Sequence, residues 1–376
     1  MPGTVANLRQ SIKAQLIERL KRRPLESRLP SVRDLAREFD AAYLTINGVV
    51  KELEWEGYVR RIPRKGTFIA SRERTVHRDV QTGTSRLRSI IFAYPNYFSY
   101  ATWVRLHNTE ERAIKQRLAL VEFKMNPQTS YYAGLRELIE ARGDVCGVLV
   151  IPVPGAVSRT DVTALDEVGV PVVLLGPSDF ASLSQRVWSV TTDWYRCGYL
   201  QAQQLLAAGH RRLAFVQHEP LAQERQGLML RGMRQAVREA GLRQRDLDVL
   251  SAGIRPWDDS REAAFELTRE LMNAGEATAA IYESIRGVQG AYRAARDLDR
   301  RIPDDLSIIA TGIGNGDEDY FNPPVTTVDP RPDVEMDVAL RCVLRPDESE
   351  AKRQTVEPVL TQRFSVSDIT AASMVA

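Results

Sequence analysis

Seven short apolar runs between Ser89 and Thr311 alternate with amphipathic helical segments, and this alternation constrains the fold more than any other feature. Because each run is apolar at successive positions, both faces of the predicted strands are buried, which is typical of parallel sheets covered by helices on both sides. About 280 residues exceed what one such sheet usually holds, so an α/β fold with two lobes is expected. The predicted strands are residues 89–94, 119–123, 145–151, 171–175, 212–217, 279–282 and 306–311, and the predicted helices are 110–118, 131–141, 199–209, 232–241 and 288–298.

The first 70 residues have a different pattern. Apolar residues recur at steps of three and four, which predicts helices with one buried face, and Pro24 ends the first of them. Ser31 and Asp34 are spaced to cap the second helix by mutual hydrogen bonds. The predicted elements are helices at 5–22, from Ser31 onward and at 43–56, and strands at 58–62 and 66–70. Three helices followed by a hairpin predict a winged helix-turn-helix.

The charge of the chain is segregated. Residues 1–78 contain 17 Lys and Arg against 9 Asp and Glu, whereas the whole 376-residue chain has 51 against 49. The first fifth is therefore cationic and the remainder is net acidic. A polyanion partner, double-stranded DNA, is expected for the N-terminal part.

The stretch LPSVRDLAREFDAAYLTINGVVKELEWEGYVRRIPRKGTFIA, Leu29 to Ala70, resembles the winged-helix domain of the GntR family of bacterial transcription regulators. Four pieces match in order: Pro-Ser-x-Arg-x-Leu-Ala, a Thr on the recognition helix, Leu-Glu-x-Glu-Gly, and Lys-Gly-Thr-Phe on the wing. The resemblance implies a helix inserted in the major groove and a wing tip at the minor groove. The DNA-contacting candidates are Ser31, Arg33, Tyr43, Thr45, Asn47, Arg64, Lys65, Gly66 and Thr67.

Two departures from the GntR pattern bear on sequence preference. Family members usually have a Ser-Arg pair at the start of the recognition helix, where this chain has Ala42 and Tyr43. They also have an Arg two positions after the Thr, where this chain has Asn47. Since Arg reads guanine and Asn prefers adenine, we expect an operator that differs from the family's commonest sequence.

Three blocks of the larger part resemble the sensor domain of LacI/GalR regulators, which is similar to periplasmic sugar-binding proteins. They are residues 189–216, 300–330 and 356–366. The resemblance implies a ligand held between two α/β lobes, with chain crossovers near Thr192, Thr311 and Asp329. The combination with a GntR-type head resembles regulators of the arabinose-repressor type.

The ligand pocket matches the LacI/GalR pattern less well. Met229 occupies the place of an Arg three residues before Gly232, Ser284 and Ile285 that of an Asn-Asp pair, and Gly312 that of an Asp. The ligand class therefore stays open: a carbohydrate, a charged metabolite, an aromatic molecule or none. The candidate effector-binding residues are Tyr97, Phe98, Trp103, Asp193, Arg225, Glu283, Arg286 and Asn315.

Other kinds of site have little support in the sequence. Three scattered cysteines, Cys146, Cys197 and Cys342, form neither a disulfide framework nor a metal-ligand set. His210 and His218 have no further ligands nearby, and no catalytic motif or cofactor lysine is evident, so we expect no metal, cofactor or catalytic residue. With no apolar stretch of about 20 residues, a cytoplasmic location is expected.

These observations predict a dimeric, DNA-binding transcriptional repressor that is controlled by a small-molecule effector. The expected organisation is a winged helix-turn-helix at 1–70, a linker at 71–87 and a two-lobed effector-binding and dimerisation domain at 88–376. Two alternatives are a metabolite-processing enzyme with an accessory basic domain and a constitutive DNA-binding protein with a degenerate pocket.

Overall fold

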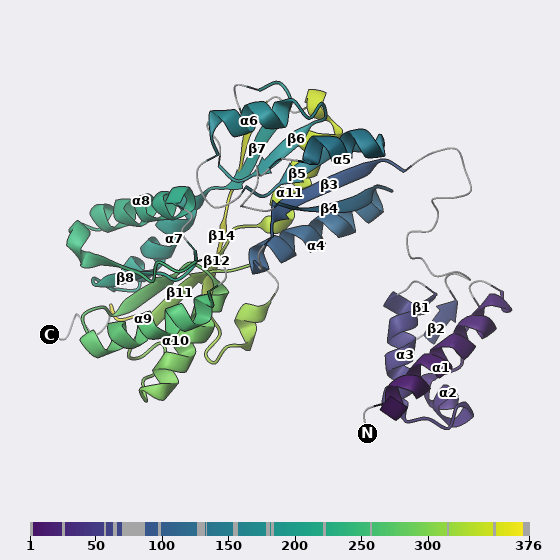
Figure 1. The fold of residues 1–376 in the computed structure, drawn as a ribbon. Helices are drawn as coiled ribbons and strands as arrows, with labels where there is room; N and C mark the ends of the chain where they lie inside the picture. Colours follow the sequence, from purple (N-terminus) through teal and green to yellow (C-terminus); the bar gives the residue numbers. More distant parts are fainter. Residues whose placement is uncertain are drawn as a thin grey trace. The chain divides into compact units, whose positions relative to one another are not determined.

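The computed structural model describes residues 3–24, 27–55, 58–62, 66–69, 87–96, 99–125, 132, 134–152, 157–177, 181, 184–220, 223–255, 258–313, 316–348 and 351–370. The chain divides into two compact units, Met1–Arg86 and Leu87–Ala376 (Figure 1). Within the described ranges, every helix is too short or too polar to cross a membrane.

The first unit has a single core where the helices meet a hairpin. Leu16, Leu35, Ile46, Leu53 and Ile69 are fully buried and pack in one cluster. The predicted cap is confirmed, because Ser31 Oγ accepts from Asp34 N at 3.2 Å and donates to Asp34 Oδ2 at 2.6 Å. The elements are α1 (Gly3–Lys21), α2 (Val32–Glu38), α3 (Tyr43–Trp55), β1 (Val59–Ile62) and β2 (Gly66–Ile69).

The first lobe of the second unit is a six-stranded parallel sheet in the order β13-β7-β6-β5-β3-β4. Alternate residues of β3 enter opposite cores: Ile90 and Phe92 pack with α4 and α11, and Ile91 and Ala93 pack with α5 and α6. Both faces are therefore covered, as the apolar runs predicted. The strands are β3 (Ser89–Pro95), β4 (Ala119–Met125), β5 (Val145–Val150), β6 (Val172–Leu175), β7 (Val187–Thr192) and β13 (Arg353–Val356), and the helices are α4 (Tyr100–Lys115), α5 (Leu135–Arg142), α6 (Arg159–Asp166) and α11 (Pro332–Leu344).

The second lobe repeats this architecture with the strand order β14-β12-β11-β10-β8-β9, in which β14 alone is antiparallel to its neighbour. Helices α7 and α8 cover one face of the sheet and α9 and α10 the other (Figure 1). The strands are β8 (Leu213–Gln217), β9 (Leu247–Ser251), β10 (Ala279–Tyr282), β11 (Ser307–Thr311), β12 (Thr326–Asp329) and β14 (Val359–Thr361), and the helices are α7 (Trp194–Ala207), α8 (Gln223–Glu239), α9 (Ser260–Ala274) and α10 (Ile285–Asp297). Short 3-10 turns are η2 (Gln244–Asp246), η3 (Asp317–Tyr320) and η4 (Pro346–Glu348).

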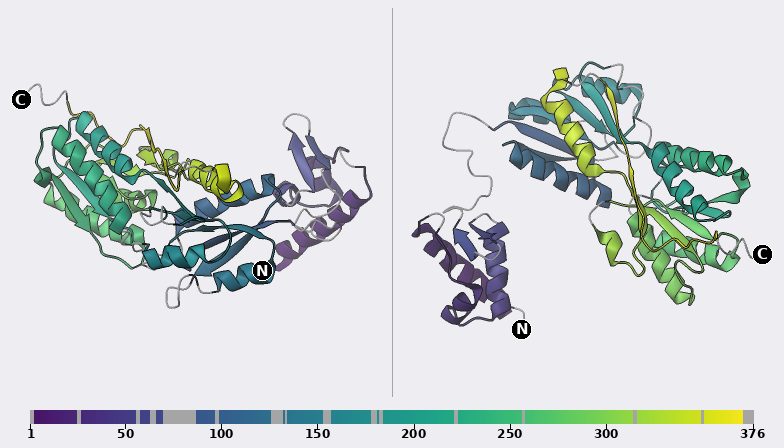
Figure 2. Two further views of the ribbon diagram at one scale, coloured as in Figure 1. Left: turned by 90° about the horizontal axis from the view of Figure 1, so that it is seen from above. Right: turned by 180° about the vertical axis from the view of Figure 1, so that it is seen from behind.

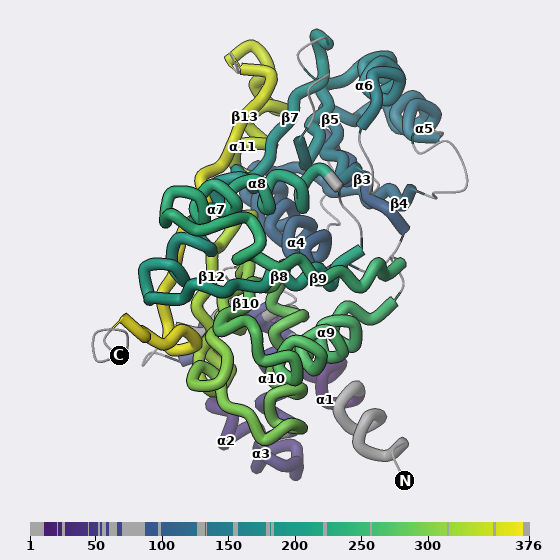
Figure 3. Tube along the Cα trace, turned by 90° about the vertical axis from the view of Figure 1, so that its left-hand side faces the viewer, coloured from purple at the N-terminus to yellow at the C-terminus, as the bar shows by residue number. Residues whose placement is uncertain are grey.

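Three crossovers join the lobes. The chain passes from β7 to α7 after Thr192 and from β12 to α11 after Asp329, as predicted. The prediction of a crossover near Thr311 is wrong, because β11 and β12 pair in the same sheet. The third crossover instead lies between β13 and β14, and the yellow C-terminal strands follow it from one lobe to the other in Figures 2 and 3.

Candidate functional sites

The exposed side of α3 is the candidate DNA-reading surface. One face of this helix is buried in the core through Ile46, Val49 and Val50. Tyr43, in the first turn, is 50% exposed. Thr45 and Asn47 lie half-buried on the same helix. The geometry presents polar and aromatic side chains on a helix whose inner face is anchored, which is the arrangement that a groove-inserted helix requires.

Helix α2 places further polar groups beside α3. Ser31 is occupied as the cap of α2, so its hydroxyl is committed to Asp34. Hydrogen bonding from Ser31 also lowers the pKa of Asp34, which keeps this exposed carboxylate ionised. Arg33, two residues after the cap, is exposed to solvent.

The wing is a hairpin, and an isolated β-bridge joins Arg28 to Phe68 on its second strand. Strands β1 and β2 are antiparallel, with Ile62 opposite Gly66. Leu29 N donates to Thr67 O at 2.8 Å and Ile69 N donates to Ser27 O at 2.9 Å, so residues before α2 brace β2. Gly66 has φ of +118°, a conformation that favours glycine. The predicted contact residues Arg64 and Lys65 lie outside the described residues.

A cavity of about 240 Å³ lies between the two lobes of the second unit. Both walls carry polar groups, and the first-lobe wall has more apolar lining residues than polar ones. The cavity sits at the C-terminal ends of parallel strands, where α/β sheets commonly bind ligands. Its lining includes Ser99, Thr102, Val104, Arg105, Ile151, Leu175, Thr191, Trp194, Glu224, Arg225, Glu283, Ser284, Thr311, Ile313 and Glu335.

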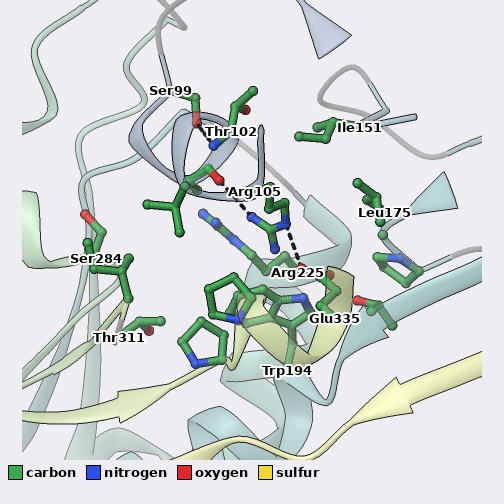
Figure 4. Close-up of a pocket in the computed structure, with 18 of the residues that line it drawn as sticks. Ser99, Thr102, Arg105, Ile151, Leu175, Trp194, Arg225, Ser284, Thr311 and Glu335 are labelled. Carbon is green, nitrogen blue, oxygen red and sulfur yellow. Dashed lines mark hydrogen bonds and ion pairs between the residues drawn. The ribbon is translucent and has the colours of Figure 1, made fainter. Parts of the chain in front are cut away.

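Arg105 and Glu335 form a closed ion pair on the first-lobe wall (Figure 4). Arg105 Nε donates to Glu335 Oε2 at 2.7 Å, and the Glu335 side chain is only 1% exposed. A second guanidinium nitrogen of Arg105 donates to Ala101 O at 3.4 Å. Because the Glu335 carboxylate matches its charge, Arg105 contributes little net charge to the cavity.

Arg225 and Glu283 face each other on the second-lobe wall. The Arg225 guanidinium lies over the Trp194 ring, 5.5 Å from its centroid, and its Nη2 is 3.7 Å from Glu283 Oε1. The other Glu283 oxygen accepts from Glu219 N at 2.9 Å. Burial raises the pKa of Glu283 to about 7, and the nearby Arg225 charge opposes that rise.

The structure brings only part of the predicted effector site together. Arg225 and Glu283 line the cavity. Trp103 is 52% exposed and stacks between Tyr100 and His107 on α4. Tyr97, Phe98 and Asn315 lie outside the described residues.

The remaining two predicted effector residues have structural partners outside the lining. Asp193 caps α7, where its carboxylate accepts from Arg196 N at 2.8 Å. Arg286 forms an ion pair with Asp259 at 3.3 Å and donates to Ser260 Oγ at 3.2 Å.

Sequence reasoning missed Arg105, Glu335 and Trp194, which all line the cavity. Arg105 and Glu335 are 230 residues apart, so no local pattern connects them. Trp194 lies two residues after Thr192, where the chain crosses to the second lobe, and an aromatic residue so close to a predicted crossover was an available signal. Met229, at the place of the family's Arg, is a residue of α8 that is fully buried in the core of the second lobe.

Comparisons with known proteins match both units. Residues 8–69 match the model of bacterial regulatory proteins of the gntR family, and residues 202–366 match a periplasmic binding protein-like domain. Catabolite control protein A from Priestia megaterium is 27% identical over 164 residues, which are 43% of this chain and 46% of that protein. The chain thus spans about half the length of this curated relative.

Solved structures resemble the second unit. A LacI family transcriptional regulator from Enterococcus faecium with bound ribose has a TM-score of 0.62 and 22% identity, covering 74% of this chain and 99% of that one. A LacI family transcriptional regulator from Weissella paramesenteroides with bound sucrose has a TM-score of 0.63 and 19% identity, covering 75% and 100%. These likenesses show a shared fold of two α/β lobes.

Proposed function

Because this chain joins a GntR-type helix-turn-helix domain to a periplasmic-binding-protein-like domain homologous to that of LacI-family regulators, we propose that it regulates transcription by binding operator DNA. We further propose that it acts as a cytoplasmic repressor and that a small molecule in the cleft controls it. The matched relatives are transcription regulators rather than enzymes, which disfavours the enzyme alternative.

The observation that carries this proposal is the match of a cationic N-terminal unit to the gntR model together with an anchored α3. A net positive unit is attracted to the phosphate backbone whatever the sequence, and this attraction depends on salt. The side chains of α3 then reach base edges. Asn47 is suited to form two hydrogen bonds with the major-groove edge of adenine. Affinity and sequence preference therefore come from different residues of one unit.

Dimerisation follows from the geometry of DNA. A palindromic operator presents its half-sites about 34 Å apart or at a multiple of this spacing, so two recognition helices are needed to read it. We propose that the second unit supplies the dimer contacts and that residues 71–87 link it to the DNA-binding unit. The arabinose-repressor type stays a prediction.

The cleft supports control by a ligand that closes the lobes. The similar structures with bound ribose and bound sucrose are of regulators, which favours a small carbohydrate effector here. A ligand that contacts both walls binds the closed arrangement better than the open one and shifts the population toward it. A coupling of about 1–3 kcal/mol would change operator affinity about 5- to 150-fold.

Selection from a random duplex pool tests the proposed function. The full chain should enrich a pseudo-palindromic site, and its affinity for this site should fall steeply as salt rises. A constitutive DNA-binding protein would enrich a site but ignore every metabolite. Enrichment of no sequence, combined with no binding to DNA at low salt, would refute the proposal.

A further inference from the structure

Arg225 and Glu283 leave two polar atoms unmatched in the cleft. Arg225 Nε and Glu283 Oε1 are both buried, and neither has a hydrogen-bond partner among the described residues. The closest approach of the pair, 3.7 Å between Nη2 and Oε1, is too long for a hydrogen bond. A buried donor and a buried acceptor that both lack a hydrogen-bond partner raise the free energy of the protein without ligand.

Other contacts hold Arg225 and Glu283 in place and maintain the 3.7 Å distance between Nη2 and Oε1. Trp194 lies beneath the Arg225 guanidinium, and Glu219 N fixes the second Glu283 oxygen. The Glu219 carboxylate is itself engaged by Ser284 Oγ at 2.5 Å. The two side chains are thus fixed near each other without a mutual hydrogen bond.

A hydroxyl group satisfies both unmatched atoms, because its oxygen accepts from a guanidinium while its hydrogen is donated to a carboxylate. A carboxylate or phosphate would be attracted to Arg225 but repelled by the ionised form of Glu283, so its rejection should strengthen as pH rises through about 7. An ammonium group would be attracted to Glu283 but repelled by Arg225. Like charges in a desolvated site oppose binding strongly.

We propose that Arg225 and Glu283 are the specificity-determining pair of the cleft, which accepts a neutral hydroxyl of the effector and rejects acidic and amino analogues. This inference rests on the proposed function, because it names the chemistry of the ligand that the regulator senses.

The rest of the cavity is consistent with a compact ligand that carries no negative charge, because the lining adds the carboxylate of Glu224. Arg105, the other cation among the described lining residues, is neutralised by Glu335. Val104, Ile151 and Leu175 supply an apolar wall opposite the polar pair. The volume of about 240 Å³ lies just below the range of about 300–1,000 Å³ for typical ligand pockets, which favours a ligand of one ring over a larger one.

The experiment measures binding of matched sugars to the full chain by calorimetry. The probes are neutral pentoses and hexoses, ribose and glucose among them, each paired with its sugar acid and its amino sugar. We expect a neutral sugar to bind, and both charged analogues to bind at least about tenfold more weakly.

Two variants separate the roles of the pair. Glu283→Gln removes the negative charge, so discrimination against the sugar acid should shrink by about tenfold while discrimination against the amino sugar persists. Arg225→Met removes the positive charge and should give the opposite pattern. Circular dichroism and operator binding establish that each variant folds.

Several outcomes would overturn the inference. A charged analogue that binds the parent protein as tightly as its neutral counterpart would do so, as would unchanged selectivity in both folded variants. Binding of no neutral sugar by the parent would also overturn it. None of these results affects operator binding by the parent, so the DNA-binding function is judged separately.

Discussion

The phenol of Tyr100 donates a hydrogen bond to Asp317 Oδ2 at 3.0 Å and thereby joins the first lobe to the second. Tyr100 is the first residue of α4, next to Ser99, which lines the cavity. Asp317 begins η3, shortly after the cavity-lining Ile313. The contact therefore bridges the lobes beside the ligand cavity and stabilises this arrangement of the lobes.

The Tyr100→Phe substitution should favour the open lobes in the absence of ligand. Loss of one partly exposed hydrogen bond costs about 1 kcal/mol, which raises the ratio of open to closed molecules about fivefold. Fluorescence energy transfer between labels in the two lobes would measure the change. Tyr292→Phe is the matched control, because Tyr292 bonds to Pro323 O within the second lobe. Equal lobe separation in the Tyr100 variant and the parent would contradict the prediction.

Glu283 should make the stability of the second unit depend on pH. Its ordinary pKa is near 4.5 and burial raises it to about 7, so the folded state retains this proton longer than the unfolded state does. The free energy of unfolding should therefore fall as pH rises from about 4.5 to 7.

Other ionisable groups lie near Glu283, so its contribution to stability must be measured as the difference between the parent and a Glu283 variant. Arg225, the Glu219 N–H group and the Gln226 side chain oppose the rise in the pKa of Glu283, and the Glu219 carboxylate adds to it. His218, whose pKa burial lowers to about 4, gives the opposite slope between about 4 and 6.5. Urea denaturation of the parent and of Glu283→Gln at several pH values isolates the contribution of Glu283. The advantage of the variant over the parent should grow toward pH 7, and a constant difference would contradict this.

Arg33 and Asn47 should have separable effects on DNA binding. Arg33→Ala should weaken binding to all duplexes and lower the salt slope by about one, as loss of one phosphate contact does. Asn47→Ala should instead relax base preference, at a cost of about 1–3 kcal/mol on the preferred site. Arg136→Ala, which removes an exposed charge from α5 in the second unit, is the control. The assignment fails if Arg33→Ala keeps the parent's salt slope and Asn47→Ala selects the parent's site.

The elements that sequence predicts best are those buried on both faces. All seven apolar runs are strands. Six of them are largely buried, as expected for parallel strands covered on both faces, and the seventh, β4, is an edge strand with exposed side chains. The edge strands β9 and β13 were not predicted, since their side chains alternate between buried and exposed. The buried strands β7 and β12 were also not predicted, because serine and threonine make them less apolar than the other strands. Helix α4 begins at Tyr100, ten residues before its predicted start, because its exposed face carries the aromatic Trp103 and obscures the periodicity.

The site was less predictable than the fold for a physical reason. Arg225 and Glu283 could be chosen because each is a charged residue beside an apolar element. Arg105 and Glu335 meet only after α11 crosses back to the first lobe, and a pairing made by tertiary structure leaves no local pattern. Asp193 and Arg286 looked suitable by position, but hydrogen bonds with their own neighbours engage them.

Gly198 and Gly232 allow α7 and α8 to pack at backbone distance. A Cβ on Gly232 would lie 1.9 Å from Tyr195 O, and one on Gly198 would lie 2.1 Å from Met229 O. Backbone atoms of a packed helix cannot move aside locally, so Gly232→Ala must push the two helices apart. We expect a loss of about 2–3 kcal/mol in the free energy of unfolding of the second unit, from overpacking.

Gly227→Ala is the matched test on the same helix. Gly227 is exposed in α8, and a Cβ there would have no atom within 4 Å. Without a clash, the substitution should stabilise the helix by about 0.5–1 kcal/mol, because alanine loses less backbone entropy than glycine. Chemical denaturation of the two variants should therefore give shifts of opposite sign. If neither alanine changed the free energy of unfolding, the close approach of α7 and α8 would not require glycine at position 232, and the packing explanation would be wrong.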